Sequence, residues 1–295
     1  IRMSGVEPEA RRIAEEAVRD MATYGLIDAN AENLSFSSDS RQNPFYTQAT
    51  STSWQDLRSN ASIVMYMNAY EDPRRASYFS KSGYDGIYVG VRAGIQNVTP
   101  TDYATYSYPL FAEKDPVPVM YASESWFLRA EGALLGWTMG DTAENLYNTG
   151  VKTSLELWGN GSSYETYIAS ETAPALSYAD PRNKHNVSDF GTAVSVKWAD
   201  DGNELVRIIT QKWIANHMIG HEAWADVRRT GYPRLLQVVN NLSGGMWGNV
   251  DSSKGMRRLH YPQSEYDNNR ENVLKGVELL GGSDLHGTDV WWAKK

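Results

Sequence analysis

The 295-residue sequence contains no cysteine, which excludes disulfide bonds, thiolate metal sites and cysteine nucleophiles. Positive charge is in deficit, because 28 lysine and arginine residues face 36 aspartate and glutamate residues, and the formal net charge is −8. A nucleic-acid-binding protein needs a basic face that displaces counterions from phosphates, so this class of function is excluded. No stretch approaches the roughly 18 consecutive apolar residues that a membrane-spanning helix requires.

Aromatic residues, in contrast, are abundant: the chain has 10 Trp, 18 Tyr and 6 Phe, while Gly and Pro, with 24 and 11 residues, are close to average usage. Tryptophan and tyrosine each combine an apolar face with a polar group. Such a composition indicates either a large core or flat surfaces that stack on the rings of a ligand.

Apolar residues recur at helical spacing in several segments. The first predicted helix begins near Pro8 and is stopped by Gly25. A later one starts at Leu205 and is broken by Gly220, and a short helix follows it and ends at Gly231. The last covers residues 270–280.

Residues 119–159 form the clearest unit of the sequence, which reads as helix, tight turn and helix. Asp141 or Thr142 is the expected N-cap of the second helix, and Gly159 ends it. The pattern resembles one tetratricopeptide unit, which needs neighbouring units to bury both of its faces. Small residues are expected where the two helices approach closely: Ala130, Gly132 and Ala133.

Two long segments, residues 28–118 and 160–200, are rich in loop-forming residues. Within the first, residues 62–70 are compatible with either a strand or a helix, and residues 84–91 are predicted to form a short strand. In the second, residues 193–198 alternate between larger apolar residues and small or polar ones, and this pattern predicts a strand.

His217 and His221 are four residues apart, the spacing at which a helix directs two imidazoles to one metal ion. The motif is not His-Glu-x-x-His, and Gly220 weakens the helix that it needs, so a structural role is favoured. Arg228 and Arg229 could bind an anion, but cations also stabilise the C-terminal end of a helix, and this structural role is favoured too.

The sequence carries no recognisable catalytic motif. A Gly-x-Ser-x-Gly elbow, a Walker loop and a Gly-x-Gly-x-x-Gly motif are all missing. Glycosidase chemistry needs two carboxylates at a suitable distance, and with 36 acidic residues the sequence alone cannot select such a pair. We therefore predict no catalytic residues, no metal site and no cofactor.

Rings in the loop-rich segments are the better indication of function. They are flanked by glycine, serine, asparagine and glutamine, so they combine an apolar face for a pyranose with groups that hydrogen-bond to hydroxyls. The alternative is that the loops fold back and bury these rings in small clusters. The candidate ligand-binding residues are Phe45, Tyr46, Trp54, Tyr84 and Tyr88.

Several distinctive motifs lie in order along the whole chain. The longest are GHEAWADVRRTGYP at residues 220–233 and RRLHYP at residues 257–262. Shorter ones lie at residues 2–8, 14–17, 72–75, 121–124, 129–133 and 146–151, and a tail runs from residue 272 to residue 292. In this order and spacing the motifs resemble the SusD/RagB family of surface glycan-binding lipoproteins of Bacteroidetes.

The resemblance implies a mainly α-helical fold of packed tetratricopeptide-like hairpins, with long loop-rich insertions and a few short strands. It also implies non-catalytic glycan binding for nutrient uptake, with a TonB-dependent transporter of the SusC type as partner. It also implies a surface-exposed lipoprotein of the outer membrane, held by a lipid anchor. The start of the chain resembles the middle of a family member, so we expect residues 1–295 to be the C-terminal portion of a single larger domain that carries the anchor in its N-terminal half. Two alternatives stay open: a glycan hydrolase or metal-dependent enzyme, and a tetratricopeptide-like scaffold that binds protein.

Overall fold

The structure is a computed structural model that describes residues 1–37, 41–49 and 57–293. Its regular elements are mainly helical, which confirms the predicted fold class. The described strands form two separate antiparallel pairs. In one pair β1 (Leu34–Phe36) lies against β2 (Val117–Met120), and in the other β3 (Ala175–Tyr178) lies against β4 (Val187–Thr192). Neither pair is wide enough to form a layer, so helices supply the framework.

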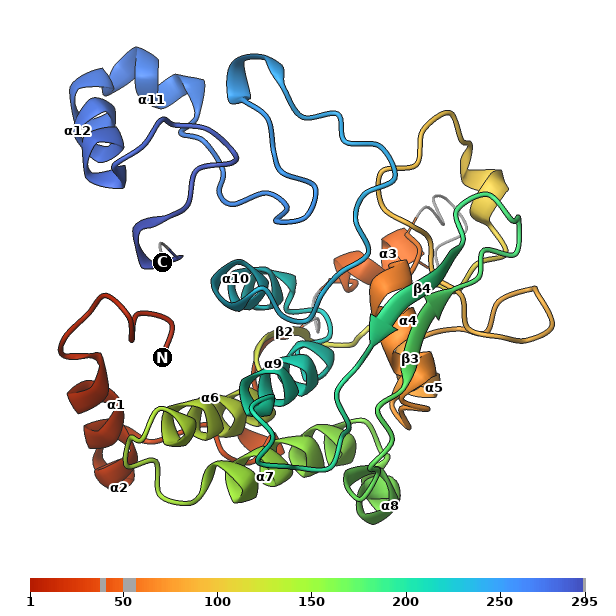
Figure 1. The fold of residues 1–295 in the computed structure, drawn as a ribbon, viewed down its shortest axis with the longest axis horizontal. Helices are drawn as coiled ribbons and strands as arrows, with labels where there is room; N and C mark the ends of the chain where they lie inside the picture. Colours follow the sequence, from red (N-terminus) through yellow and green to blue (C-terminus); the bar gives the residue numbers. More distant parts are fainter. Residues whose placement is uncertain (38–40, 50–56, 294–295) are drawn as a thin grey trace.

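The centre of the framework consists of α6 (Ala122–Leu134), α7 (Ala143–Leu157), α9 (Glu204–Ala215) and α10 (Gly220–Thr230). Figure 1 shows α6 beside α7, with α9 and α10 above them. Thr142 is the N-cap of α7, because its side chain accepts a hydrogen bond from the Asn145 N–H at 3.2 Å. Gly231, with φ of 81°, ends α10 in the left-handed conformation that glycine favours. The helices predicted in these segments are confirmed.

The largest hydrophobic cluster lies between α6, α7 and α9 and includes Phe127, Tyr147 and Ile208. A Cβ atom on Gly150 would lie only 3.0 Å from the Phe127 ring, so α6 and α7 approach most closely there. Gly132 was expected at this approach but instead faces the Met139 side chain and Ile1.

Residues 62–70, which the sequence left open between strand and helix, form most of helix α4 (Ala61–Ala69) and its C-cap residue Tyr70, and α5 (Arg75–Tyr78) follows. Asn60 caps α4 by accepting a hydrogen bond from the Ser62 N–H at 2.8 Å. Val64 and Met67 pack into one hydrophobic cluster, whereas Met65 and Tyr66 pack into another. Because α4 is buried on two sides, it lacks the one-sided apolar stripe that identifies a helix in a sequence.

Both strands that sequence predicted are wrong. Residues 84–91 contain turns with positive φ at Asp85 and Gly86, and only Val91 makes a strand-like bridge, to Asn60. Residues 193–198 follow β4 as irregular backbone. There the carbonyls of Val194 and Val196 accept hydrogen bonds from tyrosine hydroxyls, so the alternation reflects burial against helices and not strand pairing.

The remaining elements lie around this framework. They are α1 (Ala10–Arg19), α2 (Met21–Tyr24), α3 (Pro44–Ala49), α8 (Tyr164–Ile168), α11 (Gln263–Asn268) and α12 (Arg270–Leu280). The first predicted helix is interrupted at Asp20, where α1 ends, and Gly25 stops α2 as expected. The predicted last helix is confirmed as α12. No helix in the described ranges combines the length and apolar character needed to cross a membrane.

Candidate functional site

The five ring residues predicted from the sequence lie in different parts of the loop-rich segment. Phe45 and Tyr46 belong to α3, and Tyr84 and Tyr88 lie in the irregular stretch after α5. Trp54 lies outside the described residues. All four described rings are half-buried, so they are neither fully exposed nor enclosed in the core.

Asn43 holds α3 in place although it is nearly fully buried. Its side-chain oxygen accepts hydrogen bonds from the N–H groups of Phe45 and Tyr46, at 2.8 and 3.4 Å. Its side-chain nitrogen donates to the carbonyl of Asp115 at 2.9 Å, and its backbone N–H donates to the carbonyl of Glu113 at 2.9 Å. One side chain thus caps the helix and attaches it to a segment about 70 residues away.

This attachment brings Phe45 against Phe111. The two rings stack with their centroids 5.5 Å apart and an angle of 25° between their planes, and both are half-buried. The exposed Gln42 amide nitrogen donates to the Glu113 carboxylate at 3.0 Å. A stacked ring pair with an amide and a carboxylate on the same two segments is equipped for a ligand that has an apolar face and hydroxyls.

Sequence reasoning missed Phe111, which forms half of this ring pair. It lies in a loop-rich segment but follows Pro109 and Leu110 and precedes Ala112, so it lacks the glycine, serine, asparagine or glutamine neighbours by which the sequence selected Phe45. Its pairing with Phe45, however, depends on the long-range contacts of Asn43, which no local pattern shows.

Tyr84 and Tyr88 are tied into the protein instead of joining the pair. Tyr84 packs edge-on against the buried Tyr106 with ring centroids 5.5 Å apart. The Arg75 guanidinium lies 5.0 Å from the centre of the Tyr88 ring and therefore covers one of its faces. No ring stacking recorded for the described residues joins either tyrosine to Phe45 or Phe111.

The histidine pair does not form a metal site. His217 stacks on Tyr78 with centroids 4.0 Å apart, and burial lowers its pKa to about 3, so the imidazole is neutral. The His221 side chain is 68% exposed. In the described parts of the chain, no three histidine or acidic side chains gather as a metal would require. The favoured structural reading therefore fits His217.

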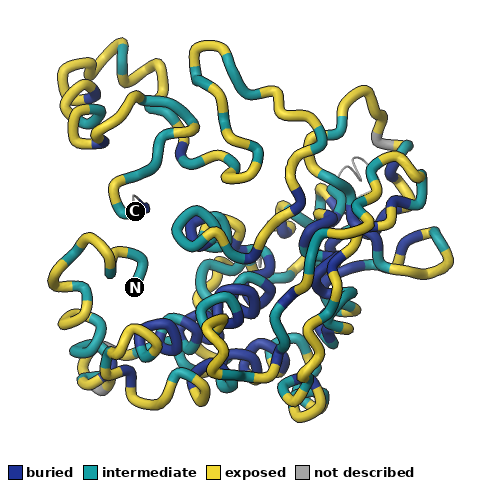
Figure 2. The backbone as a smooth tube through the Cα atoms, in the orientation of Figure 1, coloured by how far each residue is buried: buried dark blue, intermediate teal, exposed yellow. Residues whose placement is uncertain are grey.

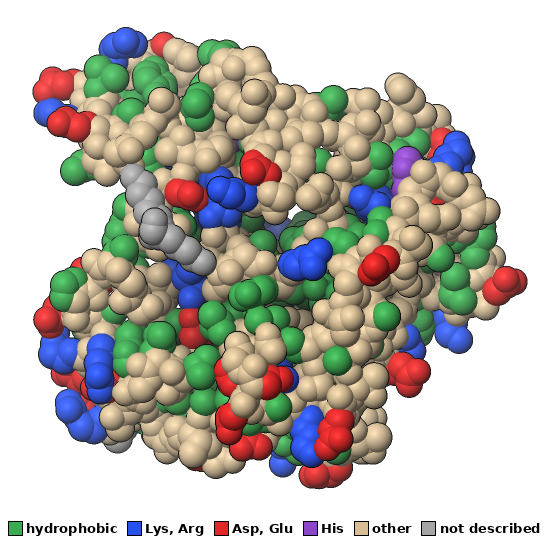
Figure 3. Space-filling view, in the orientation of Figure 1, with side chains coloured by type: hydrophobic (Ala, Val, Ile, Leu, Met, Phe, Trp, Pro, Cys, Tyr) green, Lys and Arg blue, Asp and Glu red, His purple; other side chains and the backbone are tan. Residues whose placement is uncertain are grey.

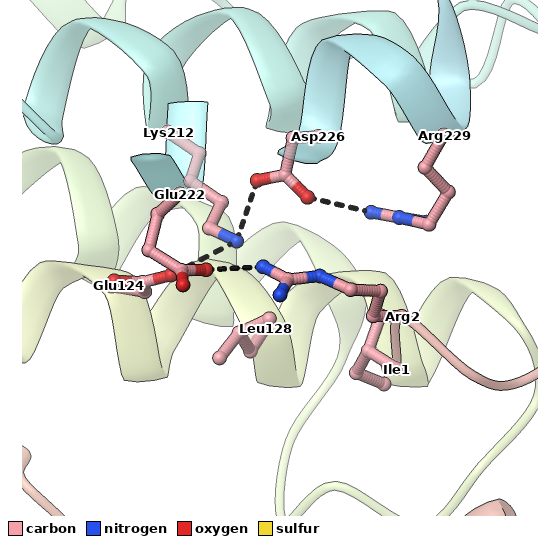
Figure 4. A pocket seen from close by; sticks show the side chains of 8 residues that line it. All are labelled: Ile1, Arg2, Glu124, Leu128, Lys212, Glu222, Asp226 and Arg229. Carbon is pink, nitrogen blue, oxygen red and sulfur yellow. Dashed lines mark hydrogen bonds and ion pairs between the residues drawn. The ribbon is translucent and has the colours of Figure 1, made fainter. Parts of the chain in front are cut away.

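A cavity of about 230 Å³ lies between α6, α9, α10 and the first two residues of the chain (Figure 4). The buried Lys212 ammonium contacts Glu124 at 3.2 Å and Asp226 at 2.7 Å. Burial raises the pKa of Glu124. For Asp226 burial acts in the same direction, but Lys212 and Arg229 outweigh it and lower the pKa. Arg2 pairs with Glu222 in the same cavity.

The two consecutive arginines of α10 serve different packing roles. Arg229 forms ion pairs with Glu131 of α6 and with Asp226, and thereby joins α10 to α6. The Arg228 guanidinium lies 3.7 Å from the centre of the Trp224 ring. These contacts support the structural reading of the arginine pair. Because the acidic groups in the cavity have cationic partners, the arrangement is an ion-pair network between helices.

The model of the SusD-like family, described as Susd and RagB outer membrane lipoprotein, matches residues 1–293. The chain belongs to the SusD-like family. No curated protein matches it.

Several solved SusD homologues are similar over the whole chain. One from Bacteroides uniformis ATCC 8492 is 41% identical with a TM-score of 0.89, and one from Bacteroides thetaiotaomicron VPI-5482 is 40% identical with a TM-score of 0.88. A chitin-binding SusD homologue from Flavobacterium johnsoniae is 40% identical with a TM-score of 0.90. The matches cover 100% of this chain but 62%, 62% and 61% of those structures, so the chain spans less than two thirds of their length.

Proposed function

We propose that this SusD-like chain contributes to the non-catalytic binding of glycans for nutrient uptake, with the ring pair of Phe45 and Phe111 as its centre. The observation that carries the proposal is the stacking of these two half-buried rings, whose two segments also carry the exposed Gln42 amide and Glu113 carboxylate. Tyr46, Trp54, Tyr84 and Tyr88 remain candidate ligand-binding residues. Family membership and the chitin-binding name of a 40% identical homologue support the same class of ligand.

The chemistry of a pyranose fits this arrangement. One face of the sugar presents C–H groups that pack on an aromatic ring, and its hydroxyls hydrogen-bond with amide and carboxylate groups at the edge. Binding through a few rings gives modest affinity, because most of the sugar stays in water and its freedom is lost on binding. Selectivity then depends on the hydroxyl contacts.

The proposed setting is the cell surface, with a TonB-dependent outer-membrane transporter of the SusC type as partner. The family description as an outer membrane lipoprotein supports this location. In this setting the chain would hand oligosaccharide to the transporter without cleaving it, and it would need neither a metal nor another cofactor.

Affinity electrophoresis tests the proposal. The protein runs through gels that each contain one polysaccharide, and chitin oligosaccharides are among the soluble competitors. We expect retardation by at least one glycan, no new reducing ends after incubation and no effect of EDTA. New reducing ends that disappear in Glu124→Gln or Asp226→Asn would instead identify a hydrolase in the charged cavity. Capture of a transporter barrel with no response to any glycan would favour the protein-binding scaffold.

A further inference from the structure

A second aromatic group lies in the C-terminal lobe, the blue region that includes α11 and α12 in Figure 1. The Trp247 ring stacks on the His260 ring, with centroids 3.4 Å apart and 18° between the planes. The His286 ring lies beside His260, and their centroids are 4.8 Å apart. His260 Nδ1 and His286 Nε2 face each other at 2.7 Å, so one nitrogen carries the hydrogen and the other accepts it.

Three separate segments hold these rings, so their arrangement is built into the fold. Trp247 ends the short helix η4 (Gly245–Trp247), in the glycine-rich loop that the sequence shows at Gly244, Gly245 and Gly248. The backbone N–H of His286 donates to the Trp247 carbonyl at 3.2 Å. The carbonyl of His286 in turn accepts the backbone N–H of Arg257 at 2.8 Å and that of Arg258 at 3.3 Å.

The charged side chains next to the imidazoles are already neutralised. Arg257 forms an ion pair with Asp289, and Arg258 forms one with Asp284. The Tyr266 hydroxyl donates to Asp284 as well, at 2.7 Å. Arg257 and Arg258, which precede His260 in the sequence, therefore have carboxylate partners. This pairing reduces the positive electrostatic field that a further cation would meet.

Two imidazole nitrogens that face each other are close to the geometry of a chelate. Metal–nitrogen bonds of about 2.0–2.1 Å at right-angled to tetrahedral coordination place two ligand nitrogens roughly 2.9–3.4 Å apart. The observed 2.7 Å has to widen by less than 1 Å, which small rotations of two half-buried rings provide. The donating imidazole moves its hydrogen to its other ring nitrogen, and both facing nitrogens then present lone pairs.

We infer that His260 and His286 form a two-histidine site for a first-row transition-metal dication, held in place by Trp247. Imidazole ligands suit Cu²⁺, Ni²⁺ and Zn²⁺ and not Mg²⁺ or Ca²⁺, which take oxygen ligands. No third histidine or acidic ligand gathers with this pair in residues 1–37, 41–49 and 57–293, so water completes the coordination sphere and the metal exchanges readily. The site is independent of the proposed glycan-binding rings.

Calorimetric titration of the untagged protein with NiCl₂, CuCl₂ and ZnCl₂ near neutral pH tests the inference. We expect one saturable site for each metal, tightest for Cu²⁺, and no response to MgCl₂. His260→Gln and His286→Gln should each weaken binding by at least about tenfold, because loss of even an outer-shell partner has that effect. His221→Gln is the matched control, since it removes a single exposed imidazole, and it should bind as the wild type does.

Tryptophan fluorescence provides a readout that does not depend on the histidine variants. Cu²⁺ bound at His260 lies within a few ångströms of the Trp247 indole and should quench its emission, and Zn²⁺ added first should prevent the quenching. Trp247→Phe should remove the quenched component. Binding that is absent, or that is equal in His260→Gln, His286→Gln and the wild type, would overturn the inference.

Discussion

Two regions of the molecule place their aromatic and polar side chains in opposite ways. In the framework of α6, α7, α9 and α10, rings such as Phe127 and Tyr147 are fully buried, and charged groups are paired. In the loop-rich stretch, Phe45 and Phe111 stack on each other but keep part of their surface exposed. Figure 2 shows the difference as dark blue helices beside long yellow and teal loops.

The difference indicates a division of labour. In the framework, charged groups pair with one another, as in the ion-pair network of Figure 4. On the face of the molecule drawn in Figure 3, exposed hydrophobic side chains are scattered among many polar and backbone atoms. The loop-rich stretch needs only a few fixed points, of which Asn43 is one, to hold a ring pair. Stability and binding should therefore respond to different substitutions.

The largest loss of stability is expected from Arg74→Met. Arg74 is fully buried and forms an ion pair with Asp72 while it also donates to Ser154 and Gln211. Burial alone would lower its pKa, but the Asp72 carboxylate outweighs this effect and raises it. The substitution leaves Asp72 buried without its cation, which costs ~3–5 kcal/mol. Urea unfolding measures the loss, and a cost below ~1 kcal/mol would contradict the expectation.

A matched pair of substitutions tests the charged cavity. Asp226→Asn should cost about 3 kcal/mol at neutral pH, because Lys212 and Arg229 stabilise the ionised carboxylate. Glu124→Gln should cost less than half of that, since burial disfavours the charged form of Glu124. Unfolding free energies at neutral pH compare the two. Equal losses of unfolding free energy would mean that Lys212 stabilises the two carboxylates to the same extent.

The pH dependence of the same pair has opposite signs. Because the folded pKa of Asp226 is lowered, its contribution to stability is present above about pH 4 and is lost as the pH falls through the folded value. The raised pKa of Glu124 means that acidification protonates it in the fold and removes a penalty. The stability difference between wild type and Asp226→Asn should therefore shrink in acid.

Helix packing supplies the next effect in size. Gly150→Ala should cost about 1–3 kcal/mol, because the new methyl group would lie 3.0–3.1 Å from carbon atoms of the Phe127 ring. Gly220→Ala is its control, since a Cβ atom at this first residue of α10 meets nothing within 4 Å. It should leave stability unchanged or raise it by ~0.4–1 kcal/mol. Thermal unfolding of the two variants under the same conditions shows whether close packing at Gly150 causes the loss of stability.

The smallest stability effect is expected from Asn60→Ala, which removes a helix cap worth about 0.5–2 kcal/mol. Asn43→Ala is the matched variant, because Asn43 caps α3 with the same side-chain oxygen contact two residues ahead. By urea unfolding Asn43→Ala should lose somewhat more stability, because Asn43 also donates to the Asp115 carbonyl. Glycan affinity should fall only in Asn43→Ala, because only Asn43 holds Phe45 against Phe111. A similar fall in glycan affinity in both variants would contradict the role of Asn43 in holding the ring pair.

Helices could be predicted from the sequence where a single physical cause determined them. The stripe and caps of α7 and the glycine after α12 identified both helices, because each helix buries a single face or ends at a left-handed residue. The sequence pattern failed for α4, which is buried on two sides, and for residues 193–198, whose carbonyls accept tyrosine hydroxyls. Tertiary contacts decided both cases.

The candidate site could be predicted from the sequence only in part. Loop composition selected Phe45, but the partner ring at Phe111 and the role of Asn43 arise from contacts between segments about 70 residues apart. The paired imidazoles of His260 and His286 have the same origin. A sequence shows which rings lie in loops, whereas the fold determines which of them meet.

The most direct test of the account is a calorimetric titration of Phe111→Ala with the glycan that retards the wild-type protein most. The account predicts an affinity about three- to tenfold lower, as expected for the loss of one ring-stacking contact, and a stability loss of at least about 0.5–1.5 kcal/mol from the lost stacking on Phe45. Leu110→Ala, which removes a neighbouring exposed side chain that is not aromatic, should bind as the wild type does. An unchanged affinity in Phe111→Ala would contradict the claim that this ring pair is the centre of the binding site.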